Sequence, residues 1–317
     1  MVAPLASVIV PSLNGAHLLP DCLDSLVGQS YADLELIVAD GASTDSTASL
    51  LVDKYPSVRF LRLRRNGGFS GNVNAGLRAA RGEVLCLLNN DARADPDWVS
   101  ICVDALMREP DLGAVASKVL FTDGLTINSA GDMLCYDGAP RQRGNGQPDG
   151  PQWDEPQLVF GAMGGAAAYR RAMLTDVGLL DEQFFMYLED VDLAFRAQLR
   201  GWSCRYEPLA RVNHRGSATG GGKLASFYNG RNLIRLLAKD LPGGLVPHML
   251  SGIVAFQMQR AREALAAWRG TAARATLRGQ LVGLAELPLH LAARPPIQRR
   301  RRVSDQAIFA LLSPVPT

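Results

Sequence analysis

Three carboxylates occur close together in the segment FFMYLEDVDLAFR, residues 184–196. Glu189, Asp190 and Asp192 follow an aromatic, apolar approach and open a stretch with helical spacing, in which Asp192 and Arg196 can pair one turn apart. A carboxylate at the start of a helix faces the positive end of the helix dipole, so it stays ionised and can accept a proton. We therefore predict that Asp190 is a general base. The alternative is that these acids only cap a surface helix.

Polar residues of the types found in turns occur in four further segments, each directly after a run typical of a β-strand. These segments are residues 11–14, 40–45, 66–74 and 89–91. Each of them alone fits an ordinary turn. The carboxyl ends of parallel strands, however, meet at one edge of a sheet, and ligands bind there. The four segments together predict a ligand site at that edge. No GxGxxG follows the first strand, which argues against a dinucleotide site.

Strands and helices alternate in the part of the chain that must position these residues. Strands are predicted at residues 7–10, 34–39, 58–63 and 82–88, and helices at 16–28, 47–54, 98–108 and from the glycine-rich turn at 66–68 through residue 80. The run 82–88 is almost continuously apolar, as expected for a strand buried on both faces. The alternation predicts an α/β fold with a mostly parallel, doubly wound sheet flanked by helices.

Composition and length fit a globular enzyme. The 317 residues, 47% hydrophobic and 20% charged, suit one two-part domain with an appendage. The five cysteines lack any CxxC spacing, which predicts neither a zinc site nor disulfides and favours a reducing cytosol. The opening MVAPLASVIVPSLNG has no basic leader and is interpreted as a first strand, not as a signal peptide. No apolar run reaches the roughly 18 residues of a spanning helix.

Charge is distributed unevenly along the chain. Residues 1–222 contain 19 basic and 27 acidic side chains, whereas residues 223–317 contain 14 and 4. Basic residues recur at helical intervals in 224–239 and 255–280, and four arginines stand at 299–302. We predict an amphipathic helical region that binds an anionic membrane surface.

One alternative is a helical bundle that packs on the rest of the chain or forms a homodimer, with its arginines solvated. Another is nucleic-acid binding, against which the acidic first part and the lack of a recognition motif argue.

Seven segments, taken together and in order, resemble the family 2 inverting glycosyltransferases of GT-A fold. The resemblance is to the bacterial rhamnosyltransferase-like branch, which builds cell-surface polysaccharides, and it runs from about residue 5 to about residue 240. The segments are SVIVPSLNG, VADGASTDST, RRNGGFSGNVNAG, CLLNNDA, FGAMGGAAAYRR, GLLDEQFFMYLEDVDLAFR and NHRGSA. The resemblance implies a nucleotide-sugar-binding half (1–95), an acceptor-binding catalytic half (96–222) and a helical C-terminal appendage (223–317).

The resemblance also implies how a donor and a metal ion are held. Asp40 matches the acidic residue that hydrogen-bonds the pyrimidine base. Asp91 ends the triplet that stands where the family has a metal-binding DxD motif, but the first acid is replaced by Asn89. A divalent cation, Mg²⁺ or Mn²⁺, would therefore depend on the diphosphate and on His214 as a further ligand. The residues implied in nucleotide-sugar binding are Pro11, Asn14, Asp40, Asn66, Gly67, Asn74, Asn89 and Asn90.

For the reaction itself, Asp190 matches the general base of the family, and Glu189 would position the acceptor. One base and direct displacement predict inversion at the anomeric carbon. The donor and acceptor pocket is predicted to include Gly164, Gly165, Tyr187, Asp192 and Arg196, although small residues also suit close packing. Residues 138–150 are predicted to form either a mobile flap over the acceptor or a plain surface loop.

The predicted reaction is metal-dependent transfer of L-rhamnose from dTDP-L-rhamnose to a saccharide or a polyprenyl-diphosphate-linked acceptor. The predicted location is the cytoplasmic face of the cytoplasmic membrane, without nucleic acid as a partner. UDP-galactofuranose or a UDP-hexose is the alternative donor. A rival hypothesis is a non-catalytic scaffold that binds a sugar nucleotide, because Asn89 weakens the metal site. The main prediction is that Asp91 and Asp190 converge on one reacting bond.

Overall fold

A ten-stranded sheet forms the centre of the molecule, and its main strand order is β10-β12-β6-β11-β4-β1-β2-β3. The computed structural model describes residues 3–216 and 222–315, so the end of the NHRGSA segment, residues 217–218, lies outside the described residues. The strands of this sheet are β1 (Ala6–Ser12), β2 (Leu34–Asp40), β3 (Arg59–Arg62), β4 (Val84–Leu88), β5 (Ala92–Ala94), β6 (Leu112–Phe121), β7 (Ile127–Ser129), β10 (Gln157–Val159), β11 (Ala166–Arg170) and β12 (Ser203–His214).

The sheet is mostly parallel, as predicted. β1 pairs in parallel with β2 and β4, and β2 pairs in parallel with β3. β11 is antiparallel to both β4 and β6, so β6 runs in the same direction as β4, and β12 is parallel to β6. The edge strand β10 is again antiparallel. The carboxyl ends of β1 to β4 therefore lie along one edge, where the four polar segments follow them.

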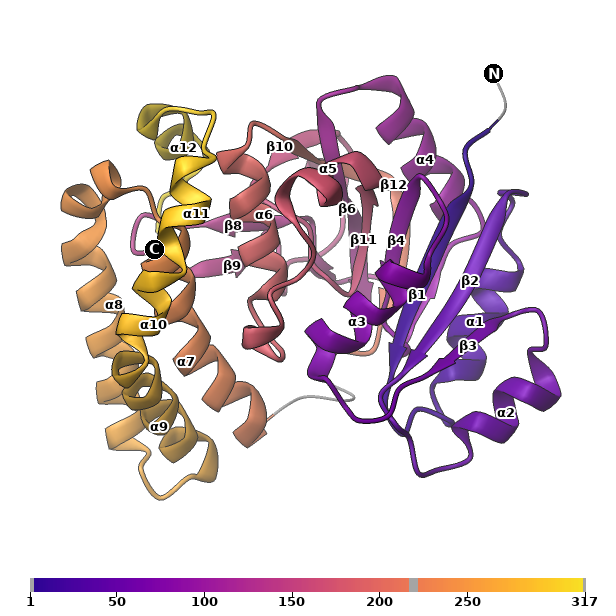
Figure 1. Cartoon of the computed structure of the whole chain (residues 1–317), viewed down its shortest axis with the longest axis horizontal. Helices are drawn as coiled ribbons and strands as arrows, with labels where there is room; N and C mark the ends of the chain where they lie inside the picture. The colour runs from indigo at the N-terminus through magenta and orange to yellow at the C-terminus, as the bar shows by residue number, and fades with distance from the viewer. Residues whose placement is uncertain (1–2, 217–221, 316–317) are drawn as a thin grey trace.

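Helices cover both faces of this sheet (Figure 1). Alternate residues of β1 explain why: Val8 and Val10 join the apolar cluster under α1, α2 and α4, whereas Ile9 joins the cluster under α3, α5 and α6. Because both faces of such a strand are buried, apolar residues do not alternate with polar ones along it, and its sequence is almost continuously apolar. These helices are α1 (Leu19–Val27), α2 (Thr47–Lys54), α3 (Gly68–Ala79), α4 (Trp98–Arg108), α5 (Arg171–Val177) and α6 (Glu189–Leu199).

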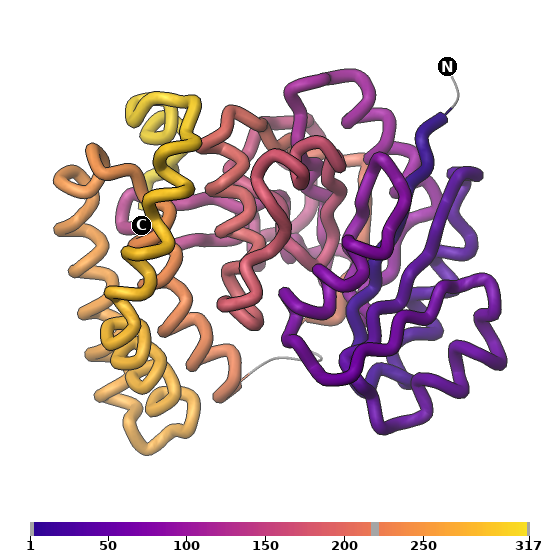
Figure 2. Tube along the Cα trace, viewed as in Figure 1, coloured from indigo at the N-terminus to yellow at the C-terminus, as the bar shows by residue number. Residues whose placement is uncertain are grey.

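The C-terminal residues form helices gathered at one end of the molecule (Figure 2). The predicted helix at 224–239 is α7, but the predicted stretch 255–280 is divided between α8 and α9 by a turn around Gly270. In the described part of the chain, no helix combines the length and the apolar character needed to cross a membrane. The helices are α7 (Gly222–Asp240), α8 (Val246–Ala266), α9 (Thr271–Ala285), α10 (Leu287–Ala292), α11 (Arg294–Arg299) and α12 (Asp305–Leu311), with 3-10 turns at Pro151–Trp153, Glu182–Phe184 and Gly243–Leu245.

Residues 138–150 are not a structureless loop. A separate two-stranded sheet of β8 (Asp132–Leu134) and β9 (Pro140–Gln142) includes their beginning. Their end is fixed by Asp149, whose carboxylate accepts a hydrogen bond from the buried Lys118 ammonium at 2.9 Å and one from Arg211 at 2.7 Å. The segment 138–150 therefore begins in the β8–β9 hairpin and ends in contacts with the central sheet.

Candidate active site

A cleft of about 650 Å³ lies where the ends of β4 and β12 meet the turn before β11 and the start of α6. Asp91 follows β4, His214 ends β12, and Asp190 lies in the first turn of α6, so three distant parts of the chain meet here. Of the predicted site residues, those that line the cleft are Asn89, Asp91, Gly164, Gly165, Tyr187, Glu189, Asp190 and His214.

Asp190 is held by backbone N–H groups. Gly164 N–H donates to its Oδ2 at 2.8 Å, and Val191 N–H donates to its Oδ1 at 2.8 Å. A Cβ at position 164 would come within 3.2 Å of the Asp190 Cβ, so any larger residue there would have to displace Asp190 slightly. Burial raises the pKa of Asp190, and the two N–H groups oppose this rise. The carboxylate is therefore partly desolvated and fixed in direction, as suits a base.

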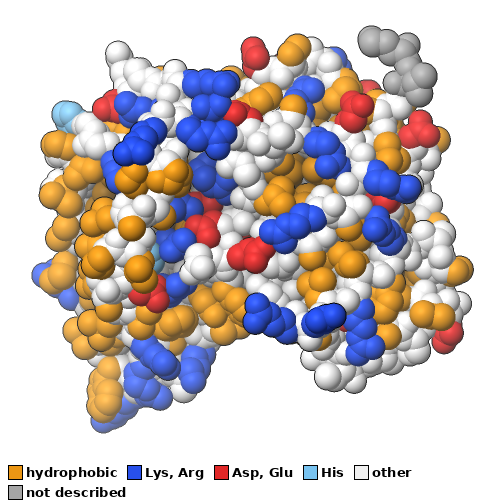
Figure 3. All heavy atoms as spheres, viewed as in Figure 1, with side chains coloured by type: hydrophobic (Ala, Val, Ile, Leu, Met, Phe, Trp, Pro, Cys, Tyr) orange, Lys and Arg blue, Asp and Glu red, His pale blue; other side chains and the backbone are white. Residues whose placement is uncertain are grey.

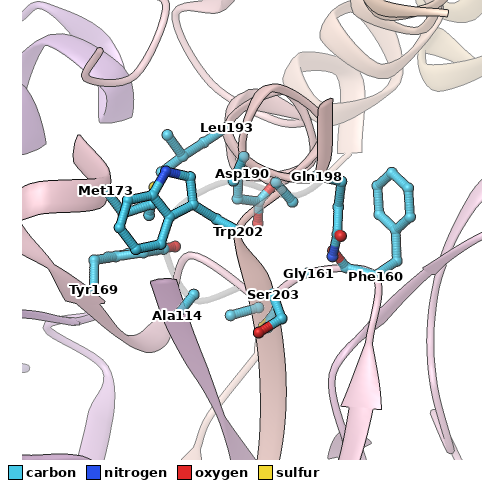
Figure 4. Close-up of a pocket in the computed structure, with 14 residues that line it drawn as sticks. Ala114, Phe160, Gly161, Tyr169, Met173, Asp190, Leu193, Gln198, Trp202 and Ser203 are labelled. Atoms are coloured by element: carbon cyan, nitrogen blue, oxygen red, sulfur yellow. The ribbon is translucent and has the colours of Figure 1, made fainter. Parts of the chain in front are cut away.

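The surroundings of Asp190 explain its desolvation. A small, mostly apolar cavity adjoins it beneath α6, and Figure 4 shows Leu193, Trp202 and Tyr169 around this cavity. The cavity measures about 10 Å³, which is room for about one water molecule. One side of Asp190 therefore meets the cleft, while the other meets side chains that solvate a charge poorly.

The segment that leads into α6 has strained backbone. Phe185, Tyr187 and Leu188 all adopt positive φ, at 65°, 67° and 67°, which costs free energy for residues other than glycine. The amide of Asn232, on α7, donates to the carbonyls of residues 184, 186 and 187 at 3.0, 2.9 and 2.8 Å. Asn232 is fully buried. This residue was not predicted from the sequence, since an isolated asparagine in a helix carries no signal of its contacts.

Asp91 and His214 face each other across the cleft floor. His214 Nε2 lies 3.1 Å from Asp91 Oδ1, and His214 Nδ1 lies 2.9 Å from the amide oxygen of Asn128. Because Nδ1 contacts Asn128, Nε2 is the ring nitrogen that faces the carboxylate. Asn89 Nδ2 lies 3.4 Å from the same Nε2. Asn128 was missed because it lies in a segment without a recognised motif.

Asp132 is a further carboxylate of this cleft that the sequence did not indicate. It is 5% exposed and lines the cleft, and no donor among the described residues hydrogen-bonds its carboxyl group. Burial and the neighbouring negative charge of Asp190 raise the pKa of Asp132 well above its usual range. The same two causes raise the pKa of Glu189, whose Oε2 has no partner among the described residues. Because the N–H groups of both Gly164 and Val191 donate to Asp190, it is the acid of this group that most readily holds a negative charge.

The predicted donor residues at the strand tips form a separate polar cluster. Asn14 Oδ1 accepts from Thr44 N–H at 2.9 Å, and Ser43 Oγ accepts from Asn14 N–H at 2.7 Å, so the tips of β1 and β2 are joined. Asp40 accepts from Ser43 N–H at 3.0 Å and is 1% exposed. Asn66 Oδ1 accepts from Gly68 N–H at 2.9 Å. Pro11 is buried within β1, and Gly67 precedes α3.

Besides these five strand-tip residues, four further predicted site residues do not line the cleft. Asn74 is 1% exposed and exchanges hydrogen bonds with the backbone of Leu180, so it attaches α3 to the segment before α6. The Asn90 amide points toward Ser12 Oγ, at 3.2 Å. Asp192 and Arg196 do pair, at 2.7 Å, but Asp192 is fully buried against α7 and Arg196 also bonds three carbonyls of residues 177–179. These four residues support the structure around the site and do not line it.

The basic residues of α7 at positions 231, 235 and 239 also differ from the prediction, because they face inward. Arg235 and Lys239 bond the Asp181 carboxylate at 2.7 and 2.8 Å, and Lys239 also pairs with Asp192. Burial of Asp181 and Asp192 demands neighbouring cations, and α7 supplies them. The basic pattern of residues 224–239 therefore serves the interior and not a membrane surface.

Comparison with known proteins assigns this fold to a class. Two solved structures align at TM-scores of 0.57 and 0.59 with 20% and 17% identity: a mannosyltransferase from Pyrobaculum calidifontis in complex with GDP-Man and Mn²⁺, and GalNAc-T7 with UDP, GalNAc and Mn²⁺. The first alignment covers 98% of this chain and 86% of the other, and the second covers 74% and 48%, so the chain spans about half of GalNAc-T7. The fold is that of the GT-A glycosyltransferases.

The sequence comparisons define the family. Residues 7–178 match the family described as Glycosyl transferase family 2, and the chain therefore belongs to it, as predicted. It is 29% identical to the N-acetylglucosaminyl-diphospho-decaprenol L-rhamnosyltransferase of Mycobacterium tuberculosis over 95% of this chain and 97% of that protein. It is 29% identical to the O-antigen biosynthesis protein RfbC of Myxococcus xanthus, over 68% of this chain and 18% of that protein. The protein is a glycosyltransferase.

Proposed function

We propose that the protein is a metal-dependent, inverting glycosyltransferase that transfers L-rhamnose from dTDP-L-rhamnose to a hydroxyl group of a polyprenyl-diphosphate-linked or other saccharide acceptor. The observation that carries this proposal is the meeting of Asp91, His214 and Asp190 in one cleft. The choice of donor and acceptor rests on the name of the mycobacterial relative, which is similar over nearly its whole length.

Asp190 is the proposed base. Each of its oxygens accepts one backbone N–H, which leaves lone pairs on both oxygens for an acceptor hydroxyl. The attacking hydroxyl loses its proton to this carboxylate as the bond to the anomeric carbon forms and the nucleotide diphosphate leaves. No second nucleophile takes part in such a displacement, so the configuration inverts. Glu189, buried beside Asp190, is proposed to position the acceptor.

Asp91 and His214 are proposed to hold the divalent cation. Two donors at right angles on an octahedral ion, each at about 2.1 Å, lie roughly 3 Å apart, and the 3.1 Å between Asp91 Oδ1 and His214 Nε2 fits this spacing. Asn128 fixes the histidine tautomer that a metal ligand requires. The described residues contain no group of three or more His, Cys, Asp or Glu side chains that could hold a metal ion. When bound, the cation would neutralise charge on the leaving diphosphate, whose oxygens would complete its coordination.

The three regions of the chain are proposed to divide the work. Residues 1–95 would bind the nucleotide through the strand-tip cluster of Asn14, Asp40 and Asn66. The base and sugar of the nucleotide would take the place of Ser43, which now donates hydrogen bonds to Asp40. Residues 96–222 would bind the acceptor. Residues 223–317 would bring the enzyme to the cytoplasmic face of the membrane, through the outward side chains of α8 and α9 and not through the inward-facing cations of α7. A homodimer through the same outward face is the alternative.

A panel of donors tests the reaction. The purified protein is incubated with dTDP-L-rhamnose, UDP-galactofuranose or UDP-glucose, Mg²⁺ or Mn²⁺, and an N-acetylglucosaminyl-diphospho-lipid. We expect transfer that stops on addition of a chelator and a product of inverted anomeric configuration by NMR. Transfer from a UDP-sugar alone would reassign the donor. Retention of configuration, or full activity with chelator, would overturn the mechanism.

A further inference from the structure

A second hollow lies between the amino-terminal parts of α7 and α9, outside the catalytic cleft. It has a volume of about 580 Å³. The two helices are closely packed beyond it, where a Cβ at Gly279 would meet the Phe227 carbonyl at 2.1 Å and a Cβ at Gly230 would meet the Thr276 carbonyl at 2.7 Å. Larger side chains replace the glycines toward the helix starts and line the groove, including Lys223, Leu224, Phe227, Tyr228, Arg274 and Arg278.

The groove has a strong excess of positive charge. Three of its lining residues are cations, and none of the described residues that line it is acidic. Arg278 lies over the Phe227 ring at 5.7 Å, and Arg274 bonds the carbonyls of residues 268 and 269 at 3.1 and 2.7 Å. Neither arginine, nor Lys223, pairs with a carboxylate among the described residues, whereas Arg231 and Arg235 on the same helix α7 do. Arginine and lysine in such a setting bind phosphate oxygens.

Apolar side chains are exposed both in the groove and on the neighbouring helix α8. Leu224 in the groove is 45% exposed, and Trp268, whose carbonyl Arg274 holds, is 59% exposed. Along α8, the exposed residues Leu250, Val254 and Met258 recur every fourth position and so share one face of the helix. Figure 3 shows hydrophobic and basic side chains together over the C-terminal helices, at the left of the view. An anionic group attached to an apolar chain matches this combination better than a free phosphate does.

The groove is next to the catalytic cleft. Tyr228 lines the groove and stacks on Phe185, with the ring centroids 5.3 Å apart. Phe185 begins the strained segment that carries Tyr187 and Asp190, and Asn229 lines the cleft itself. A ligand whose head group lies in the groove can therefore extend past this stacked pair toward Asp190.

We infer that this groove binds the diphosphate and the adjoining isoprenoid units of the lipid-linked acceptor. This inference rests on the proposed function, because it takes the acceptor to be a sugar on a lipid diphosphate. Arg278 and Lys223 bind the phosphate oxygens, Leu224 and Phe227 contact the first part of the chain, and the attached sugar reaches the cleft.

Binding of farnesyl diphosphate to the full-length protein, measured by calorimetry, tests the groove without any reaction. We expect the protein to bind farnesyl diphosphate with an affinity at least about tenfold higher than its affinity for inorganic diphosphate or for farnesol. Arg278→Gln and Lys223→Gln should each weaken binding about tenfold, and Arg278→Lys should restore most of it. The matched control is Arg262→Gln, an exposed arginine of α8 outside the groove, which should bind as the parent protein does. Unchanged binding by Arg278→Gln, or equal affinity for inorganic diphosphate, would overturn the inference.

Kinetics with two acceptors connects the groove to the reaction. The KM for N-acetylglucosaminyl-diphospho-farnesol should rise in Arg278→Gln about tenfold more than the KM for octyl N-acetylglucosaminide. An equal effect on both acceptors would contradict a role in diphosphate binding. If the parent protein glycosylates neither acceptor, the proposed function fails, while the farnesyl diphosphate titration still decides whether the groove binds this class of lipid.

Discussion

Asp91 and Asp190 line the same cleft, although almost a hundred residues separate them in the chain. Asp91 lies beside His214 at the end of the sheet, whereas Asp190 is fixed on the first turn of α6 by the Gly164 N–H. The two acids are thus held on opposite elements of one cleft, as the proposed roles of cation ligand and general base require. The cleft is large enough for a nucleotide sugar, since small-molecule sites span roughly 300–1,000 Å³.

Replacement of the proposed base should stop the reaction without loss of donor binding. For Asp190→Asn we expect kcat to fall about 10³-fold, in the range found for general bases, because the amide keeps the shape but cannot accept the proton. Rapid-quench kinetics and calorimetric titration of dTDP-L-rhamnose measure the two quantities. A variant that keeps full activity would exclude Asp190 as the base.

Changes at the proposed metal ligands should alter metal dependence instead. Asp91→Asn and His214→Ala should raise the cation concentration for half-maximal activity at least about tenfold, since each removes one of two protein ligands. Asn128→Ala should give a smaller rise of the same kind. Asp53→Asn, an exposed acid on α2, is the control. Identical cation titration curves for Asp91→Asn and the control would reject Asp91 as a ligand.

Asp132 should govern the alkaline side of the pH profile. Asp190 ionises first, and its charge together with burial holds the pKa of Asp132 well above the usual range. Rising pH then adds a second negative charge to the cleft, which opposes binding of an anionic donor. We expect kcat/KM of the parent protein to decline as Asp132 ionises, and this decline to be absent in Asp132→Asn, while the acid limb set by Asp190 remains. Superimposable profiles would argue against this role.

Asp192 should matter for stability. Burial alone raises the pKa of this carboxyl, but Arg196 and Lys239 pull it well below its usual range. A depressed carboxyl pKa adds stability above the unfolded-state value, and this stability is lost as the pH falls through the folded-state value. Asp192→Asn should lower the free energy of unfolding by about 3–5 kcal/mol at pH 7 and by progressively less below pH 4. Urea denaturation of the parent protein and the variant, at pH 7 and again below pH 4, measures this. If the free energies of unfolding differ by the same amount at each pH, the charge of Asp192 is not the cause.

Much of the fold could be predicted from periodicity. The buried run of β4 and the helix at 98–108 were predicted closely, because a continuous apolar run and apolar residues at helical spacing report local geometry directly. The division of 255–280 into α8 and α9 and the hairpin at 132–142 were not predicted. The first depends on a contact distant in sequence, the packing of α9 on α7. The second joins two three-residue strands, β8 and β9, which are too short to show a clear periodicity.

The same limit applies to the site. Motif resemblance indicated Asp91, Asp190 and His214, but it also placed Asp192 and Arg196 in the pocket. The structure instead buries Asp192 against α7 and bonds Arg196 to the carbonyls of residues 177–179. Helical spacing shows that two residues share a face, not which neighbour that face meets. Asn128, Asp132 and Asn232 carried no local signal at all.

The amino-acid sequence by itself determined the α/β class, the family and the identity of the acids available for chemistry, since periodicity and motif order are properties of the chain read along its length. The tertiary structure decided which of those acids share a cleft, which are neutralised inside, and where cations remain unpaired between α7 and α9. The physical reason is that burial and charge depend on neighbours in space, and these come from segments that the folded chain alone brings together.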